Sequence, residues 1–362
     1  MDAELQHAND VRSVVTMAAQ RLRPRFRSIL CAVDFSVHSR QALQYAAAVA
    51  KRFRGRVTVL FVNDPLLLAA ARQAYGNERQ VIEQSRAELA RFVAQAVRGS
   101  ERMTPVVAAG NPASQILASA KRLRSDLVVI GTQGLSGVQK LFFGSTTEQV
   151  LRRTAIAVLA VPPQIIRQGP AHGRLVVDQI IVPIDLAGEW QSDAVRGAAM
   201  AQMFDVPIRL VHVLRPVQTP AWIRAIGVPS QRQRIAKATR ALEQLTRKLG
   251  AGVRASCSVV LGEPAHEIAR LTKRGSPLLV MSLRGTRGVW GRRGAIAYHV
   301  LTHSATPVLA LPRRQIGGPL ASRLRRAVNE TLIARDRIEM AGIDALLSAG
   351  SGETRLKRGF KG

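Results

Sequence analysis

Cysteine is nearly absent from this sequence, since only Cys31 and Cys257 occur in 362 residues. Two cysteines do not make the disulfide framework that stabilises many small secreted domains. No stretch approaches the roughly 18 consecutive apolar residues that a membrane-spanning helix requires. The first residues carry acidic side chains and no apolar segment of the signal-peptide kind. We therefore expect a cytoplasmic protein without a membrane anchor.

Acidic and aromatic residues are also scarce. Only 24 Asp and Glu oppose 53 Lys and Arg, which gives a net charge of +29 and a pI of about 11.7. Such a charge attracts polyanions, including nucleotides and nucleic acid. Aromatic residues make up only 4% of the chain, so few side chains can stack on single-stranded bases. Two interpretations stay open: a nucleic-acid or polyanion binder, or an arginine-rich surface that is only solvated.

The common catalytic motifs are missing as well. No Gly-x4-Gly-Lys-Ser/Thr loop occurs, and Val33–Ser39 matches neither a Ser-Gly-Gly-x-Asp-Ser loop nor a His-x-Gly-His motif. His299 and His303 have a spacing that metal ligands can use, but the glutamate of a His-Glu-x-x-His motif is absent. We predict no catalytic residue, and Cys31 is most simply a core residue in a buried strand.

What the sequence does contain is an internal duplication. Residues 28–34 (SILCAVD) reappear 151 residues later as 179–185 (QIIVPID). An alanine-rich helical pattern and a β-rich run follow in both places. Further matched pairs are Gly110–Ile116 with Gly262–Ile268, Leu127–Ile130 with Leu278–Met281, and Val158–Pro162 with Val308–Pro312. Two homologous domains are therefore predicted.

Each copy alternates continuous apolar runs with helical patterns, which is typical of a parallel sheet covered by helices on both faces. The fold class is α/β, with two tandem domains. We expect an N-terminal extension (1–27), a first domain (28–163), a linker (164–176), a second domain (177–313) and a basic tail (314–362). The tail is interpreted either as a docking or polyanion-binding arm or as a solubilising segment.

A glycine-rich motif follows a buried strand in the first copy: Gly131-x2-Gly134-x9-Gly144-Ser145. In an open parallel sheet, ligands bind at the carboxyl ends of the strands, where loops present backbone N–H groups. Glycines let such a loop approach a ligand, and a helix starting near Ser145 would direct its N-terminus at a phosphate. Asp34 ends the first strand at the same edge. A glycine turn with ordinary helix caps is the alternative interpretation for these residues.

With this motif, its flanking strands and the closing Val158–Pro162, the duplicated region from Ser28 to Pro312 resembles two tandem universal stress protein domains. The motif is similar to the nucleotide-binding signature of the ATP-binding branch of that family. The resemblance implies an open five-stranded parallel sheet in each half, of the adenine nucleotide alpha hydrolase-like kind. It also implies bound ATP or a related adenine nucleotide, together with Mg²⁺.

Carried over by position, the resemblance implies a role for each residue of the motif. Asp34 and Val62 would lie beside the adenosine, and Gly131 and Gly134 would let the ribose and phosphates approach. The residues implied to hold the phosphates are Gly144, Ser145, Thr146 and Thr147. Because family members pair through their last strands, the two halves could form an intramolecular pseudo-dimer, and a homodimer is the alternative.

The second copy departs from the pattern, since it reads Ser282-x2-Gly285-x8-Gly294-Ala295. The first glycine is a serine, one residue is missing, and the hydroxyl after the last glycine is gone. We expect one competent nucleotide site, in the first domain. The resemblance then implies a nucleotide-binding regulator of the stress response that acts on an unknown protein partner. Slow ATP hydrolysis or autophosphorylation is the alternative, and polyanion binding is a further one.

Overall fold

The computed structural model describes two α/β domains within one compact unit that extends from Thr16 to Arg314. The described residues are 26–75, 78–97, 99, 102–133, 144–163, 170, 173–186, 190–217, 230–249, 252–283, 299–301 and 303–312. The expectations for most of the N-terminal extension and for the basic tail therefore lie outside the described residues.

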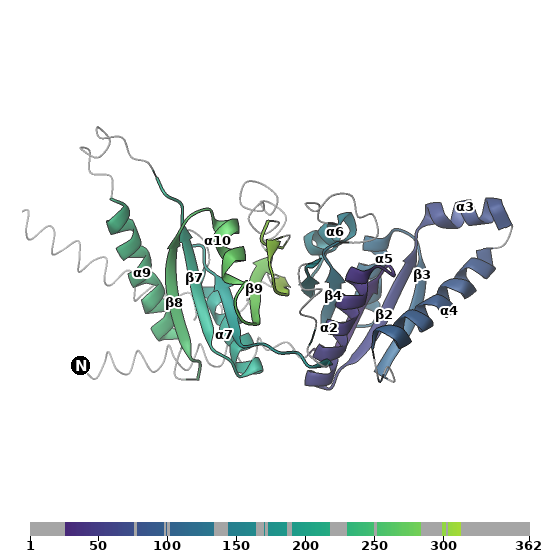
Figure 1. Ribbon diagram of the computed structural model, residues 1–362, viewed down its shortest axis with the longest axis horizontal. Helices are drawn as coiled ribbons and strands as arrows, with labels where there is room; N and C mark the ends of the chain where they lie inside the picture. The colour runs from purple at the N-terminus through teal and green to yellow at the C-terminus, as the bar shows by residue number, and fades with distance from the viewer. Residues whose placement is uncertain are drawn as a thin grey trace, which may run out of the picture. The chain divides into compact units, whose positions relative to one another are not determined.

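The first domain alternates strands and helices in the order that the sequence predicts (Figure 1). Its elements are β1 (Ser28–Val33), α2 (Val37–Phe53), β2 (Arg56–Asn63), α3 (Pro65–Tyr75), α4 (Glu78–Ala96), β3 (Met103–Ala109), α5 (Pro112–Arg122), β4 (Leu127–Gly131), α6 (Ser145–Arg153) and β5 (Ala157–Val161).

The second domain repeats this plan. Its elements are β6 (Gln179–Pro183), α7 (Trp190–Phe204), β7 (Ile208–Leu214), α9 (Gln231–Lys248), β8 (Ala255–Leu261), α10 (Pro264–Leu271), β9 (Pro277–Leu283) and β10 (Val308–Pro312). Residues 299–301 and 303 are also helical. None of the helices that the structure describes is long and apolar enough to cross a membrane.

All ten strands belong to one sheet, in the order β3-β2-β1-β4-β5-β10-β9-β6-β7-β8. Within each domain the five strands are parallel, which confirms the predicted fold class. The domains join where β5 and β10 pair antiparallel, with Leu309 opposite Leu159. The last strands therefore pair within one chain, as the pseudo-dimer interpretation expected.

Strand residues alternate between the two faces of the sheet, so each strand supplies two apolar layers. Leu30 and Ala32 point to the face that carries α5 and α6, where they join a core cluster with Ile116 and Val150. That cluster continues across β5 and β10 into the second domain. The residues between, such as the fully buried Cys31, face the opposite side, which α2 covers. Both faces of the sheet are therefore buried, as the near-continuous apolar strand sequences predict.

Helix caps explain where several helices begin. α5 and α10 each start with proline in the first turn, which suits proline because it lacks the N–H that this turn leaves unpaired. α2 begins at Val37, because Ser36 caps it by accepting a hydrogen bond from the Ser39 N–H.

Candidate functional site

The strand order places a candidate ligand site between β1 and β4. From β1 the chain proceeds outward to β2 and β3, and then returns to the other side of β1 to form β4 and β5. The carboxyl ends of β1 and β4, at Val33 and Gly131, therefore flank the point where the strand order reverses. In open α/β sheets this point is the usual place for a ligand. Asp34, Gly131 and the start of α6 meet there.

Gly131 is closely packed against backbone atoms. A Cβ added at this position would lie 3.4 Å from the His38 carbonyl carbon and oxygen and 3.3 Å from the Gln133 oxygen. These distances are tighter than most real Cβ contacts, and backbone cannot swing aside as a side chain can. Packing between β4 and the first turn of α2 therefore favours glycine here without any ligand.

Gly144 is different. It is the N-cap of α6, with φ −60° and ψ 130°, a conformation open to every residue type. A Cβ there would meet Thr132 O at 3.6 Å and Thr147 Oγ1 at 3.9 Å, which are ordinary contacts. The chain could therefore carry a capping Ser or Asp here, yet Gly144 makes no side-chain cap hydrogen bond. The first turn of α6 is left without the usual side-chain oxygen at its N-terminus.

Hydrogen bonds hold the start of α6 against the end of β4. The Gly144 N–H donates to Thr132 O at 2.9 Å, and the Thr147 hydroxyl donates to Gly131 O at 2.8 Å. Thr147 is buried, so its hydroxyl positions the helix and only its backbone N–H is left for a phosphate. Ser145 is exposed and Thr146 is half-buried at the same helix end. The hydroxyl residues of the motif therefore differ: the Thr147 side chain is used within the fold, whereas Ser145 and Thr146 are at least partly exposed.

Asp34 and Val62 lie at neighbouring strand ends, because Val33 is in register with Phe61. Asp34 Oδ1 accepts a hydrogen bond from the Ser36 N–H at 3.1 Å. The alternative interpretation of Asp34 as the cap of the next helix is wrong, since Ser36 caps α2. Val62 packs against the core cluster at the end of β2. Gly134 lies outside the described residues, so its predicted role stays a prediction.

Two polar side chains near this edge were not singled out as site residues by the sequence. The Thr132 hydroxyl and His38 Nδ1 are both buried and have no hydrogen-bond partner among the described residues. Burial lowers the pKa of His38, although the nearby charge of Asp34 opposes this effect. The imidazole is therefore neutral at pH 7, with one nitrogen able to donate and one able to accept. Only their positions, directly after Gly131 and in the first turn of α2, could have indicated them.

The same edge of the second domain carries different residues. Ser282 and Leu283 replace Gly131 and Thr132, and β9 continues through both of them, paired with Leu311 and Pro312 of β10. The rest of the degenerate motif, including Gly285 and Gly294, lies outside the described residues. The expectation that this copy lacks a competent site therefore stays a prediction.

Among the described residues, no group of three or more His, Cys, Asp and Glu side chains is placed to hold a metal ion. His299 and His303 have ring centroids 5.8 Å apart, and His303 Nδ1 lies 2.9 Å from the His299 carbonyl oxygen. Cys31 is fully buried in β1, and burial raises the pKa of its thiol, so it is unreactive. This bears out its interpretation as a core residue.

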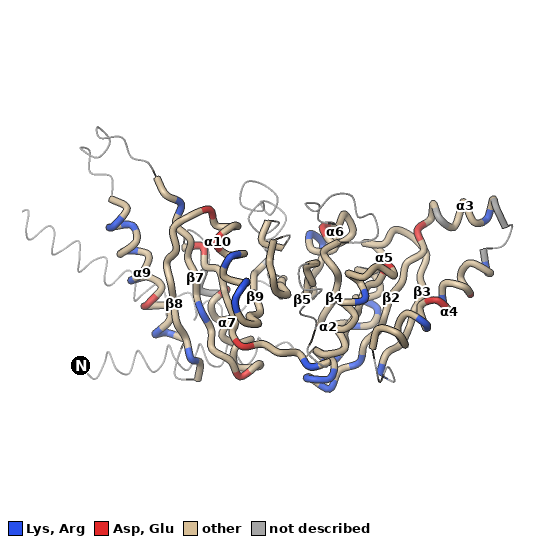
Figure 2. Tube along the Cα trace, viewed as in Figure 1, with Lys and Arg blue, Asp and Glu red and all other residues tan. Residues whose placement is uncertain are grey.

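The basic residues gather unevenly on corresponding helices (Figure 2). α4 and α9 occupy equivalent places beside the outer strands β3 and β8. In α4, Glu and Arg alternate along the helix, and Glu88 pairs with Arg91. In α9, one acid, Glu243, stands among the basic residues Arg232, Arg234, Lys237, Arg240, Arg247 and Lys248. Within the described part of the chain, α9 is thus a strongly basic helix.

Comparison with known sequences relates both halves of the chain to one family. The model of the universal stress protein family matches residues 25–162 and again residues 177–312. A universal stress protein from Thermus aquaticus is 33% identical over 136 residues, which are 38% of this chain and 98% of that protein. Another, from Methanocaldococcus jannaschii, is 26% identical over 139 residues, which are 38% of this chain and 82% of that protein.

A solved structure shows the same fold over a longer part of the chain. The crystal structure of a universal stress protein from Archaeoglobus fulgidus covers 82% of this chain and 100% of its own, with a TM-score of 0.57. The sequence identity is 17%, so this likeness shows a shared fold.

Proposed function

Because the chain belongs to the universal stress protein family, we propose that its first domain binds an adenine nucleotide, namely ATP, and that this binding regulates a protein partner in the cytoplasm. The proposed contacts come from one edge of the sheet. They are Asp34 and Val62 beside the adenosine, Gly131 and Gly134 near the ribose and phosphates, and Gly144, Ser145, Thr146 and Thr147 around the phosphates.

The observation that carries the proposal is Gly144. The fold has room for a side chain at this N-cap, and a Ser, Asp or Asn would stabilise α6 relative to glycine by about a few tenths of a kcal/mol. Glycine forgoes that stabilisation and leaves the N-terminus of the helix open to an anion, which the helix dipole also favours. Gly131 gives less support for a ligand, because its packing against His38 also favours glycine.

The charge of the site also suits a nucleotide bound with a cation. Asp34 directly follows β1, and a ribose hydroxyl is a fitting donor to its carboxylate. No described cluster would hold a metal ion by itself, so Mg²⁺ would arrive with the phosphates and neutralise part of their charge. The neutral imidazole of His38 is a described side chain at this edge that could act as a base, but its Nδ1 is buried, so we propose binding without rapid turnover.

The test is to denature the purified full chain, identify any released nucleotide, and titrate ATP into the emptied protein. The variant is Gly144→Asp, and the matched variant is Gly144→Asn. Both side chains cap a helix well, so neither should lower the midpoint of thermal unfolding. The aspartate places a negative charge where the phosphates would lie, and we expect it to abolish ATP binding.

The expected result is about one ATP per chain for the wild type, a strong loss in Gly144→Asp, and a smaller loss in Gly144→Asn. An unchanged affinity in the stably folded Gly144→Asp variant would place the phosphates elsewhere. A wild type that binds no adenine nucleotide would overturn the proposal.

A further inference from the structure

A second candidate site lies on the opposite face of the sheet from the core cluster, where the two domains meet. A cavity of about 170 Å³ opens there, and we call it the seam cavity. Its floor is the cross-strand pair Leu159 and Leu309, and Leu127 and Leu278 extend that floor on the adjoining strands. α2 forms one wall, and part of the linker, including Leu175, passes beside it.

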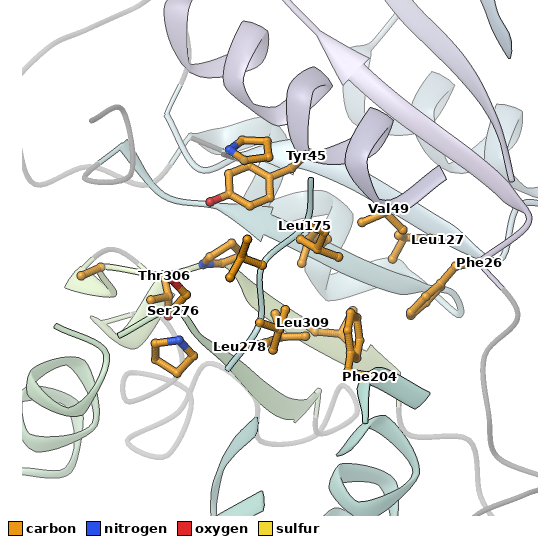
Figure 3. Close-up of a pocket in the computed structure, with 17 residues that line it drawn as sticks. Phe26, Tyr45, Val49, Leu127, Leu175, Phe204, Ser276, Leu278, Thr306 and Leu309 are labelled. Atoms are coloured by element: carbon orange, nitrogen blue, oxygen red, sulfur yellow. The ribbon is translucent and has the colours of Figure 1, made fainter. Parts of the chain in front are cut away.

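The two ends of the seam cavity differ in chemistry (Figure 3). Tyr45, Thr306 and Ser276 lie at one end, and the tyrosine hydroxyl points toward that end. Phe26 and Phe204 lie at the other end, with leucines between. Phe26 and Tyr45 are almost fully buried, at 2% and 6% exposure. The cavity is therefore apolar along most of its length and offers hydroxyl groups at one end.

One of these hydroxyls has an unfilled hydrogen-bonding capacity. Thr306 is only 4% exposed, and its Oγ1 has no hydrogen-bond partner among the described residues. The Thr306 backbone, in contrast, is hydrogen-bonded: its N–H donates to Ser304 Oγ, and its carbonyl accepts from the same hydroxyl. A buried hydroxyl without a partner destabilises the fold, and a ligand with one polar atom would supply the missing hydrogen bond.

On the other face of the sheet, side chains fill the space beside the β5–β10 pair. There, Ala160 and Val308 stand opposite one another in the ladder, and both belong to the continuous core cluster. At the equivalent positions of the second domain, the side chains are either larger than in the first domain or held by a hydrogen bond. At the positions that correspond to Tyr45 and Val49, α7 carries Arg196, which donates to Pro312 O at 2.7 Å, and Met200. The pairing of β5 with β10 therefore does not force an open space.

Any ligand of this cavity must be uncharged. Lys and Arg are absent from its lining among the described residues, and burial raises the pKa of Tyr45 to about 12, so the tyrosine stays neutral. An ionised group buried against leucines and phenylalanines would lose its hydration without a compensating partner. An apolar cavity of about 150 Å³ is known to hold benzene, which sets the size that fits here.

From this volume, lining and unpartnered hydroxyl, we infer that the seam cavity binds a small neutral ligand of the phenol class: one aromatic ring with a single hydroxyl group, the ring against the leucines and phenylalanines and the hydroxyl bonded to Thr306. The site is separate from the proposed nucleotide site, and the inference does not depend on it.

The test uses the full chain and two probes of nearly equal shape, 4-methylphenol and p-xylene, which differ in one hydroxyl. Binding is measured by ligand-observed NMR titration up to the millimolar range. Thr306→Val removes the unpartnered hydroxyl and keeps the shape of the side chain. Val49→Phe fills the cavity from α2. Thr104→Val, an exposed position on β3, is the matched control for the first variant.

We expect the wild type and Thr104→Val to bind 4-methylphenol more tightly than p-xylene. Thr306→Val should weaken 4-methylphenol roughly three- to tenfold, as the loss of one hydrogen bond implies, and leave p-xylene unchanged. Val49→Phe should bind neither probe while it stays folded by thermal melting. If neither probe binds the wild type, or if Thr306→Val leaves the ratio of the two affinities unchanged, the inference is wrong.

Discussion

The two domains share their strand order but end their fourth strands differently. In the first domain β4 ends at Gly131, and the chain then turns away. In the second domain the equivalent β9 continues through Ser282 to Leu283, still paired with β10. The outer helices differ as well, since α4 balances its charges and α9 is strongly basic.

This difference shows which positions the fold constrains. The inward residues of the strands are apolar in both copies because each must fill a sheet face. Residues at the carboxyl edge and on the outer helices are free to diverge, because side chains there contact solvent or a ligand and do not fill the core. The two edges of one chain can therefore serve different purposes, and paired substitutions can test this directly.

The largest effect is expected for the aspartates that end the first strands. Asp34→Ala should weaken ATP binding roughly ten- to hundredfold, because a hydrogen bond to a charged group contributes about 1.5–3 kcal/mol. Asp185→Ala, at the matching position, should leave ATP binding unchanged. Isothermal titration calorimetry of both variants measures this. Equal losses in the two variants would mean that both domains contribute to binding and would remove the contrast between them.

The next effect concerns Gly131 and Gly144, two glycines of one motif. Gly131→Ala should destabilise the protein by about 1–3 kcal/mol, because its Cβ would press on the His38 backbone. Gly144→Ala has room for its Cβ and should cost less, about 0.5–1 kcal/mol, because alanine is a poorer N-cap than glycine. The midpoints of thermal unfolding distinguish them. Similar midpoints would show that the close approach at Gly131 relaxes easily.

These glycines also show how far sequence reasoning can go. The duplication and the apolar runs were enough to predict both domains and the parallel sheets, because burial on two faces leaves a clear pattern. The motif predicted a buried strand before Gly131 and a helix that starts near Ser145, but not that Thr147 would donate its hydroxyl to Gly131 O. The buried Thr132 hydroxyl was not anticipated either, because partnering of a side chain depends on contacts between distant segments.

A smaller effect is expected for the charged helices. Lys237→Glu with Arg240→Glu on α9 should reduce the retention of the protein on heparin and lower the slope of log affinity against log salt by about 1–2. Arg86→Glu with Arg91→Glu on α4 changes the net charge equally and should have less effect. If both pairs reduce retention alike, total charge rather than the placement of α9 governs polyanion binding.

The smallest effect concerns the pH dependence of stability, compared for one histidine in each domain. Because burial lowers the pKa of His38, the unfolded chain takes up a proton more readily than the folded one. The stabilisation that comes from a neutral His38 is therefore complete above the unfolded pKa of about 6.5, and it is lost as the pH falls through the lower pKa of the folded state.

His38→Gln should lessen the loss of thermal stability between about pH 7 and pH 5. His266→Gln, an exposed position on α10, should not. The effect stays small because solvent reaches part of the His38 ring, and equal pH profiles for the two variants would show that Asp34 cancels the effect of burial.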